Sequence, residues 1–443
     1  MRIIIPLLLI SFLVTAHEFG HFLLAKTNGI GVLEFSVGMG PRLLTFKKGE
    51  TRYSLKLIPF GGSCAMAGEP DGYDPEEAED SLFTRFPEEK YFQNKSVWAR
   101  ISVIVAGPLF NFILAFVLSL IVIANVGINP AKVYLVREGS HAEKAGILEG
   151  DIVRSIDGKK IGIGRDIELV NLGVSYAGRE TVPVVVERAG EKVTLQIDPN
   201  RTAYMLGISY YANDDPAQIT ITIGDPGDTS SRAGLRDGDI ITAIEGVEIA
   251  SGAQMHAYLT EHPLDGSPVS VSFTHNGTPR EAVNIPEVRT VTDLGFEASY
   301  YREPGSFGQV VSGSFKEVGY WMRYVLRSLR MLVTGKLSAR NISGPVGIVS
   351  VVDDIVDQSS PGGLSAVILT LLNFATMLSA NLGVMNLLPI PALDGGRLLF
   401  LLIEAVRGKP VPPEKEGLVH TVGMVLLLVL AVLVLFSDVL KLL

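Results

Sequence analysis

The residues best suited to chemistry lie near the start of the chain, in the run His17-Glu18-Phe19-Gly20-His21. Residues four positions apart lie on one face of a helix, so both imidazoles can reach a single metal ion. Glu18 lies beside them and can take a proton from a water molecule that the metal activates. The spacing therefore predicts a zinc site with Glu18 as the general base of a hydrolase. The alternative is two histidines in ordinary core or interfacial positions.

The surroundings of this motif favour the metal. The motif lies within residues 3–25, an apolar stretch long enough to cross a bilayer as a helix. Ionisable side chains are costly in a membrane helix unless they satisfy one another or bind an ion. Arg2 and the run Val14-Thr15-Ala16 also imitate a secretory signal peptide. Apolar residues resume at Phe19, however, so we expect a retained helix.

A third ligand is expected because hydrolytic zinc takes three protein ligands and leaves one position for water. The chain has a single cysteine, Cys64, so the ligands must be mainly nitrogen and oxygen atoms. Asp394 is the candidate, at the end of the run Asn386-Leu387-Leu388-Pro389-Ile390-Pro391-Ala392-Leu393-Asp394. Prolines interrupt a helix, as in a broken segment that lines a polar cavity. Asp394 could instead cap the helix that follows it, and the two roles are compatible.

Four apolar stretches predict four membrane-spanning helices, at residues 3–25, 101–126, 364–385 and 418–436. Of the 443 residues, 47% are hydrophobic and only 19% are charged, as is typical of a membrane protein. The net charge of −9, without a dense basic block, argues against a nucleic-acid partner.

Asn111 is a polar residue inside the second span. It either lines the active site or bonds backbone freed by Pro108, and we favour the second.

A repeat with an offset of 88 residues lies between the second and third spans. Ala145-Gly146, Gly150-Asp151-Ile152-Val153 and Ile156-Asp157-Gly158 recur as Ala233-Gly234, Gly238-Asp239-Ile240-Ile241 and Ile244-Glu245-Gly246. Each copy is typical of a short helix, a turn, a strand and a hairpin. The pattern resembles the PDZ fold, and it predicts two PDZ domains inserted between membrane helices.

Alternating side chains predict a β-hairpin over residues 42–58, where Tyr53, Leu55 and Leu57 share one face. An edge strand of this hairpin could pair with an extended substrate, with Tyr53 and Leu55 in contact with it. A plain surface hairpin is the alternative. Residues 69–89 are acidic and predict a solvated loop, and residues 315–337 predict a basic amphipathic helix at the membrane surface.

Lysine and arginine in the short loops predict the orientation in the membrane. The loop after the first span and the loop before the fourth are basic, which places both in the cytoplasm. Both termini and the PDZ pair are then outside. The basic helix at 315–337 falls on the outer side and partly contradicts this rule, although anionic lipid head groups can attract it.

Taken together, the HExxH motif, the N-x-x-P-x-P-x-L-D-G segment and the PDZ modules resemble the site-2 protease family, in its bacterial form with tandem PDZ domains. The resemblance covers nearly the whole chain. Further runs with family counterparts are Phe35-Ser36-Val37-Gly38-Met39-Gly40, Ala106-Gly107-Pro108-Leu109-Phe110-Asn111 and Ser343-Gly344-Pro345-Val346-Gly347.

The resemblance implies that His17, His21 and Asp394 bind Zn²⁺, that Glu18 is the general base, and that Asn386 and Pro391 hold the substrate. It implies cleavage within transmembrane segments, such as those of anti-sigma factors or signal-peptide remnants, after a first protease has cut the substrate. The PDZ pair is expected to bind peptides or to exclude substrates whose outer domain is intact. The expected location is the bacterial inner membrane, with the active site near the cytoplasmic face.

The expected fold is a polytopic α-helical membrane protein with four transmembrane helices, a membrane-associated β-hairpin and two inserted α+β PDZ domains. Two other functions compete: a PDZ scaffold without proteolytic activity, and a membrane-bound zinc protease that cuts soluble or unfolded proteins. The expected divisions begin with the first span at 1–28, the hairpin region at 29–95 and the second span at 96–126. The PDZ domains follow at 127–209 and 210–295, and a linker with the amphipathic helix at 296–360. The third span with Asp394 is expected at 361–396, a cytoplasmic loop at 397–416 and the fourth span at 417–443.

Overall fold

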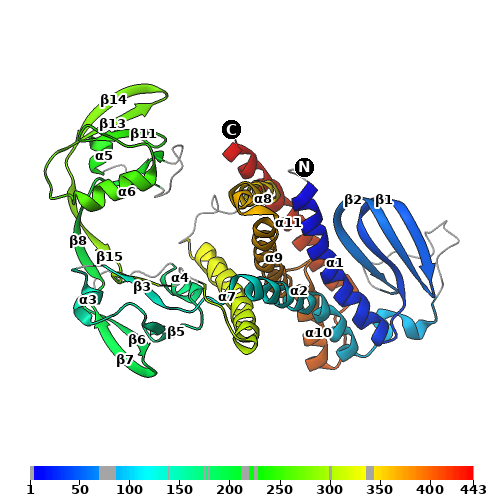
Figure 1. The fold of residues 1–443 in the computed structure, drawn as a ribbon. Helices are drawn as coiled ribbons and strands as arrows, with labels where there is room; N and C mark the ends of the chain where they lie inside the picture. Colours follow the sequence, from blue (N-terminus) through cyan, green and yellow to red (C-terminus); the bar gives the residue numbers. More distant parts are fainter. Residues whose placement is uncertain are drawn as a thin grey trace. The chain divides into compact units, whose positions relative to one another are not determined.

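The computed structural model describes residues 4–68, 86–137, 139–172, 176, 179–210, 219–223, 228–298, 302–335 and 344–442. Most of the acidic loop expected at 69–89 therefore lies outside the described residues. The chain folds into two compact units (Figure 1). The first unit comprises Met1–Ala131, Gly162–Gly173 and Ser299–Leu443, and the second comprises Lys132–Ile161 and Val174–Ala298.

The first unit is built from long apolar helices. Four segments are long and apolar enough to cross a membrane: Ile4–Thr27, Val97–Val126, Gly347–Leu387 and Glu414–Leu435. They correspond to the four predicted spans and are consistent with a polytopic helical membrane protein. The helices of this unit are α1 (Ile4–Thr27), α2 (Val97–Val126), α4 (Arg165–Asn171), α7 (Phe307–Val333), α8 (Pro345–Ser359), α9 (Gly363–Leu387), α10 (Asp394–Arg407) and α11 (Pro413–Leu442).

Helix α2 is the centre of this unit, because it packs against α1, α7, α9 and α10 (Figure 1). Its start is capped by Ser96, whose hydroxyl accepts a hydrogen bond from the backbone N–H of Ala99. Most of its buried side chains are small or aliphatic, as close helix contacts in a membrane require. Helices from the two ends of the sequence, α1 and α10, therefore both pack against α2.

The predicted hairpin is present but is longer than expected. Strands β1 (Val32–Lys48) and β2 (Thr51–Met66) are both bent, so that residues 32–37 pair with 62–66 on one side and with 52–55 on the other. Residues 42–48 pair with 51–56 beyond them. The hairpin thus folds into a small sheet in which residues 62–66 and 42–48 form the two edges.

A buried carboxylate ties this sheet together. Glu34 is 8% exposed and accepts hydrogen bonds from Arg42 Nε at 2.8 Å and Ser54 Oγ at 2.6 Å, while Lys56 Nζ lies 3.8 Å away. Burial raises the pKa of Glu34, but the two hydrogen bonds and the nearby charges outweigh it and hold the pKa below its ordinary value. The ionised carboxylate therefore stabilises the sheet.

The second unit contains two four-stranded sheets with the same strand order, as the repeat predicts. One sheet has the order β5-β4-β6-β7 and the other β12-β11-β13-β14. The strands are β4 (Ile152–Ile156), β5 (Lys159–Lys160), β6 (Val182–Arg188) and β7 (Glu191–Ile197), then β11 (Ile240–Ile244), β12 (Val247–Glu248), β13 (Val269–His275) and β14 (Thr278–Asn284). Helices α3 (His141–Ala145), α5 (Thr229–Arg232) and α6 (Gly252–Glu261) accompany them.

The two copies of the repeat also exchange strands. After the first sheet come β8 (Asn200–Met205) and β9 (Ile208–Ser209), and β9 pairs with β10 (Thr222–Ile223) at the start of the second copy. After the second sheet come β15 (Glu287–Thr292) and β16 (Phe296–Ala298), and β16 pairs with β3 (Val133–Val136) at the start of the first. These pairings cross the boundaries expected at 209/210 and 295/296. Strand β9 follows the first sheet but pairs with the second copy, and β16 follows the second sheet but pairs with the first copy.

The exchange is symmetric. Strands β8 and β15 pair antiparallel, with Thr202 opposite Thr290. These two threonines are 88 positions apart, the offset of the sequence repeat, so equivalent residues face each other. A local two-fold relation between β8 and β15 follows from this register.

Replacing Glu34 tests the role of its charge. The folded pKa is depressed, so the stabilisation is present above the unfolded pKa of about 4.5 and is lost as the pH falls through the lower folded pKa. We expect Glu34→Gln to lower the melting temperature at pH 7, and the difference from the unmodified protein to shrink below pH 4.5. Glu248→Gln, on an exposed position of β12, is the control. An equal difference at pH 7 and in acid would contradict this account.

Candidate active site

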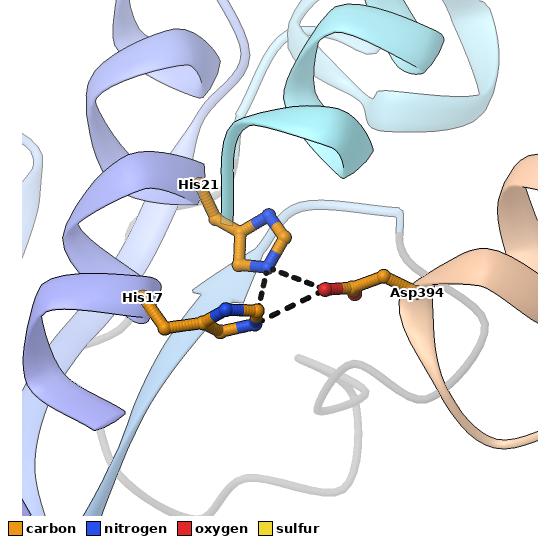
Figure 2. A group of neighbouring side chains, drawn as sticks. All are labelled: His17, His21 and Asp394. Atoms are coloured by element: carbon orange, nitrogen blue, oxygen red, sulfur yellow. Dashed lines mark hydrogen bonds and ion pairs between the residues drawn. The ribbon is translucent and has the colours of Figure 1, made fainter. Parts of the chain in front are cut away.

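Three side chains from opposite ends of the chain converge in the first unit. His17 and His21 point from α1 toward Asp394, the first residue of α10 (Figure 2). His17 Nε2 lies 3.0 Å and His21 Nε2 3.4 Å from Asp394 Oδ2, and the two Nε2 atoms are 3.2 Å apart. The histidines are buried, at 9% and 7% exposure. The structure therefore brings together the three residues that the sequence singled out as metal ligands.

The donor atoms fit a metal ion. His21 Nδ1 lies 2.8 Å from the backbone oxygen of Val103, which can only accept, so the ring proton is on Nδ1. His21 Nε2 faces a carboxylate oxygen, and this contact is attractive only if Nε2 carries a second ring proton or if a cation lies between the two atoms. Ligands about 2.0–2.1 Å from a tetrahedral zinc lie about 3.3 Å apart. The three measured separations are close to this value.

Glycines let α1 and α2 approach closely enough to build the cluster. A Cβ on Gly20 would lie 2.4 Å from the backbone oxygen of Ala106. A Cβ on Gly107 would lie 2.3 Å from His21 Nε2 and 2.7 Å from His17 Cε1. Gly107 thus leaves the space that both rings occupy. Sequence reasoning gave it no role, although a glycine inside an apolar helix is a signal of close packing.

The segment before α10 is a tight loop that depends on two further glycines. A Cβ on Gly395 would lie 2.1 Å from the backbone oxygen of Leu388, and one on Gly396 2.5 Å from that of Ile390. The N-cap of α10 is Leu393, without a side-chain cap, so Asp394 does not serve as the helix cap considered above. Its carboxylate is directed to the histidines instead.

Contacts with α2 and α11 hold this loop in place. Arg100 of α2 forms a two-pronged ion pair with Glu404 of α10, with Arg100 Nη1 3.1 Å from Glu404 Oε2. On α11, His420 Nδ1 accepts a hydrogen bond of 2.9 Å from the backbone N–H of Ala392. A Cβ on Gly423 would lie 2.2 Å from Pro391 Cβ, so α11 packs directly on the proline.

Glu18 lies beside the cluster and against strand β2. The backbone N–H of Cys64 donates a hydrogen bond to its carboxylate. A Cβ on Gly62 would lie 3.5 Å from Glu18 Cγ. The strand segment next to Glu18 is therefore 62–64, at one edge of the small sheet, rather than the 42–58 hairpin to which sequence reasoning pointed.

Of the residues predicted to contact the substrate, Asn386 lies next to His17, whereas Tyr53 and Leu55 belong to β2. Asn386, in the last turn of α9, has its Nδ2 atom 3.5 Å from His17 Nδ1. Tyr53 stacks on Phe46 with ring centroids 5.2 Å apart, and Leu55 is 44% exposed. In the described part of the chain, neither Tyr53 nor Leu55 forms a hydrogen bond or ring contact with the cluster.

Asn111 belongs to the site, contrary to our expectation. Its side chain is completely buried, and its Nδ2 atom lies 3.1 Å from His17 Nδ1. Sequence reasoning assigned it to backbone freed by Pro108, because the face of α2 that meets α1 is not visible in the sequence. The asparagine inside an apolar span was the available signal.

Gly107→Ala tests the space under the two rings. We expect the added methyl group to displace the imidazoles and to lower the zinc content of the purified protein. Alanine is the better helix former by about 1 kcal/mol, so helix propensity cannot cause the loss. Gly319→Ala on α7, where a Cβ meets nothing within 4 Å, is the matched control. Full zinc content and an unchanged melting temperature in Gly107→Ala would contradict the geometry.

Comparison with known proteins agrees with this geometry. The profile of peptidase family M50 matches residues 5–430. The chain is 31% identical to a putative zinc metalloprotease of Clostridium acetobutylicum, over 99% of this chain and 97% of that protein. It is 33% identical to the zinc metalloprotease RasP of Shouchella clausii, over 98% and 97%. It is 30% identical to the regulator of sigma-E protease RseP of Escherichia coli, over 96% and 95%. The chain therefore belongs to peptidase family M50 and is a zinc metalloprotease of the site-2 type.

Proposed function

We propose that this enzyme hydrolyses peptide bonds within transmembrane segments, with His17, His21 and Asp394 as zinc ligands and Glu18 as the general base. The observation that carries the proposal is the position of the cluster. The two histidines are buried and Asp394 is half-buried, and the helix α1 that carries both histidines is long and apolar enough to span a bilayer. A substrate that reaches them must itself enter the membrane unit.

Bound zinc supplies a Lewis acid that polarises the scissile carbonyl and makes water easier to deprotonate. Glu18 takes a proton from the attacking water and delivers it to the amide nitrogen as the C–N bond breaks. The hydrogen bond from Cys64 N–H supports this role, because it fixes the carboxylate next to the cluster.

The substrate must be extended before it can be cut, because a helix hides its carbonyl groups in hydrogen bonds. We assign its docking to residues 62–66 rather than to the 42–58 hairpin. This segment pairs with residues 32–37 on one side, and it passes Glu18. Addition of a substrate strand beside it would satisfy backbone groups that are costly to leave free in lipid. Asn386, close to His17, and Pro391, braced by α11, are the side chains expected to hold that strand.

The two repeat copies in the second unit are assigned to PDZ domains, on the basis of the repeat and the matching sheet orders. The basic loops support a position for them outside the bacterial inner membrane, with the active site near the cytoplasmic face. There they would exclude substrates whose outer domain has not been removed by a first protease. Anti-sigma factors and signal-peptide remnants are the substrate classes that this arrangement fits.

Glu18→Gln tests the catalytic assignment. The variant keeps the size of the side chain but cannot accept a proton, so we expect cleavage of a single-span substrate in detergent to fall by about 10²–10⁴-fold. Zinc content should stay at the level of the unmodified protein. Glu191→Gln, on an exposed position of β7, is the control.

Equal cleavage by Glu18→Gln and by the unmodified protein would overturn the mechanism. A second substrate, an unfolded soluble protein such as casein, distinguishes the other protease class. Faster cleavage of casein than of the single-span substrate would favour a membrane-bound protease of soluble proteins. Absence of cleavage of both substrates by the zinc-loaded enzyme would favour the scaffold.

A further inference from the structure

The amide of Asn111 lies against His17 at the atom that faces away from Asp394. Asn111 Nδ2 is 3.1 Å from His17 Nδ1, and the side chain is completely buried. Asn111 Oδ1 is also buried, and it has no hydrogen-bond partner among the residues that the structure describes. A buried amide oxygen without a donor is destabilising, so this arrangement calls for an explanation.

Metal binding imposes a proton position on His17. Its Nε2 atom faces Asp394 Oδ2 at 3.0 Å, and it can offer a lone pair to a cation only if it carries no proton. The neutral ring then carries its proton on Nδ1, which becomes a donor. The NH2 group of Asn111 is also a donor, so in the metal-binding form two donors would face each other. A half-turn of the terminal amide removes this conflict, because Oδ1 and Nδ2 exchange places.

We infer that Asn111 is a positioning residue for the metal site. In the zinc-loaded enzyme its side-chain oxygen accepts a hydrogen bond from His17 Nδ1–H and so holds the Nε2 lone pair toward the ion. The inference rests on the zinc ligands given under the proposed function. It adds a residue of α2 whose role is to orient one of these ligands.

The same helix already serves the other histidine in this way. The backbone oxygen of Val103 accepts from His21 Nδ1–H at 2.8 Å. Val103, Gly107 and Asn111 follow one another at intervals of four residues, so they lie along one face of α2. This face supplies an acceptor for His21, room for both rings, and an acceptor for His17.

The position of Asn111 is held from the opposite side. Ser379 Oγ of α9 donates a hydrogen bond of 2.7 Å to the backbone oxygen of Asn111. The competing amide, Asn386, is farther from His17 Nδ1 at 3.5 Å and is only half-buried. Asn111 is therefore the better fixed of the two amides for orienting the ring.

Zinc affinity, rather than proteolysis, gives the direct test. The full-length protein in detergent is stripped of metal and titrated with zinc against a fluorescent chelator. Asn111→Leu keeps a similar volume but has no acceptor, and we expect it to bind zinc about 10- to 100-fold more weakly. Asn111→Asp offers a carboxylate oxygen to the same N–H and should bind zinc at least as tightly as the unmodified protein. Asn125→Leu is the matched control, because Asn125 is an exposed asparagine on the same helix that bonds the oxygen of Ile121.

The outcomes separate this inference from the proposed function. Unchanged zinc affinity in Asn111→Leu, with weak binding in His21→Ala, would overturn the role of Asn111 and leave the metal site intact. Unchanged affinity in His21→Ala would overturn the metal site itself. If Asn111→Leu fails to fold, Asn111→Asp decides alone. Zinc affinity at or above that of the unmodified protein supports the inference, and a loss of tenfold or more contradicts it.

Discussion

The burial of three lone-pair donors at one point constrains the rest of the membrane unit. The ligand atoms of His17, His21 and Asp394 lie within 4.8 Å of one another. With unprotonated Nε2 atoms and no cation, such a group is repulsive and poorly solvated, so the fold must hold the three side chains together and a bound metal ion would stabilise them. Several close contacts of the unit occur around this cluster, where Gly20, Gly107, Gly395 and Gly396 each leave space that a Cβ would fill.

Helix α2 is where these requirements meet. It allows α1 to approach at Gly20 and Gly107, and it holds α10 through the ion pair between Arg100 and Glu404. It contacts α9 through Ser379. Segments from both ends of the chain are thereby fixed against a single rigid support, as a preorganised zinc site requires. The edge of the small sheet adds the last component, since Cys64 N–H orients Glu18.

Much of this arrangement could be predicted from the sequence, where short-range spacing carries the information. The interval between His17 and His21 and the four apolar stretches are local patterns, and Asp394 stands out in a proline-broken segment. Gly107 and Asn111 were missed or misassigned because their roles depend on which face of α2 meets α1. The position of residues 62–66 beside Glu18 was missed because glycines and bulges bend both strands, and the alternation at Tyr53 and Leu55 does not reveal this bend. The 88-residue offset predicted two copies, but an offset cannot show that they exchange strands.

X-ray absorption at the zinc edge tests the central claim most directly. In the zinc-loaded enzyme we predict a first shell of nitrogen and oxygen only, at about 2.0–2.1 Å, with the signature of two imidazoles. Asp394→Cys should bring one sulfur into that shell at about 2.3 Å, because the thiolate replaces the carboxylate at the same position. An unchanged shell in the fully loaded variant, or sulfur in the shell of the unmodified enzyme, would contradict the assignment of His17, His21 and Asp394.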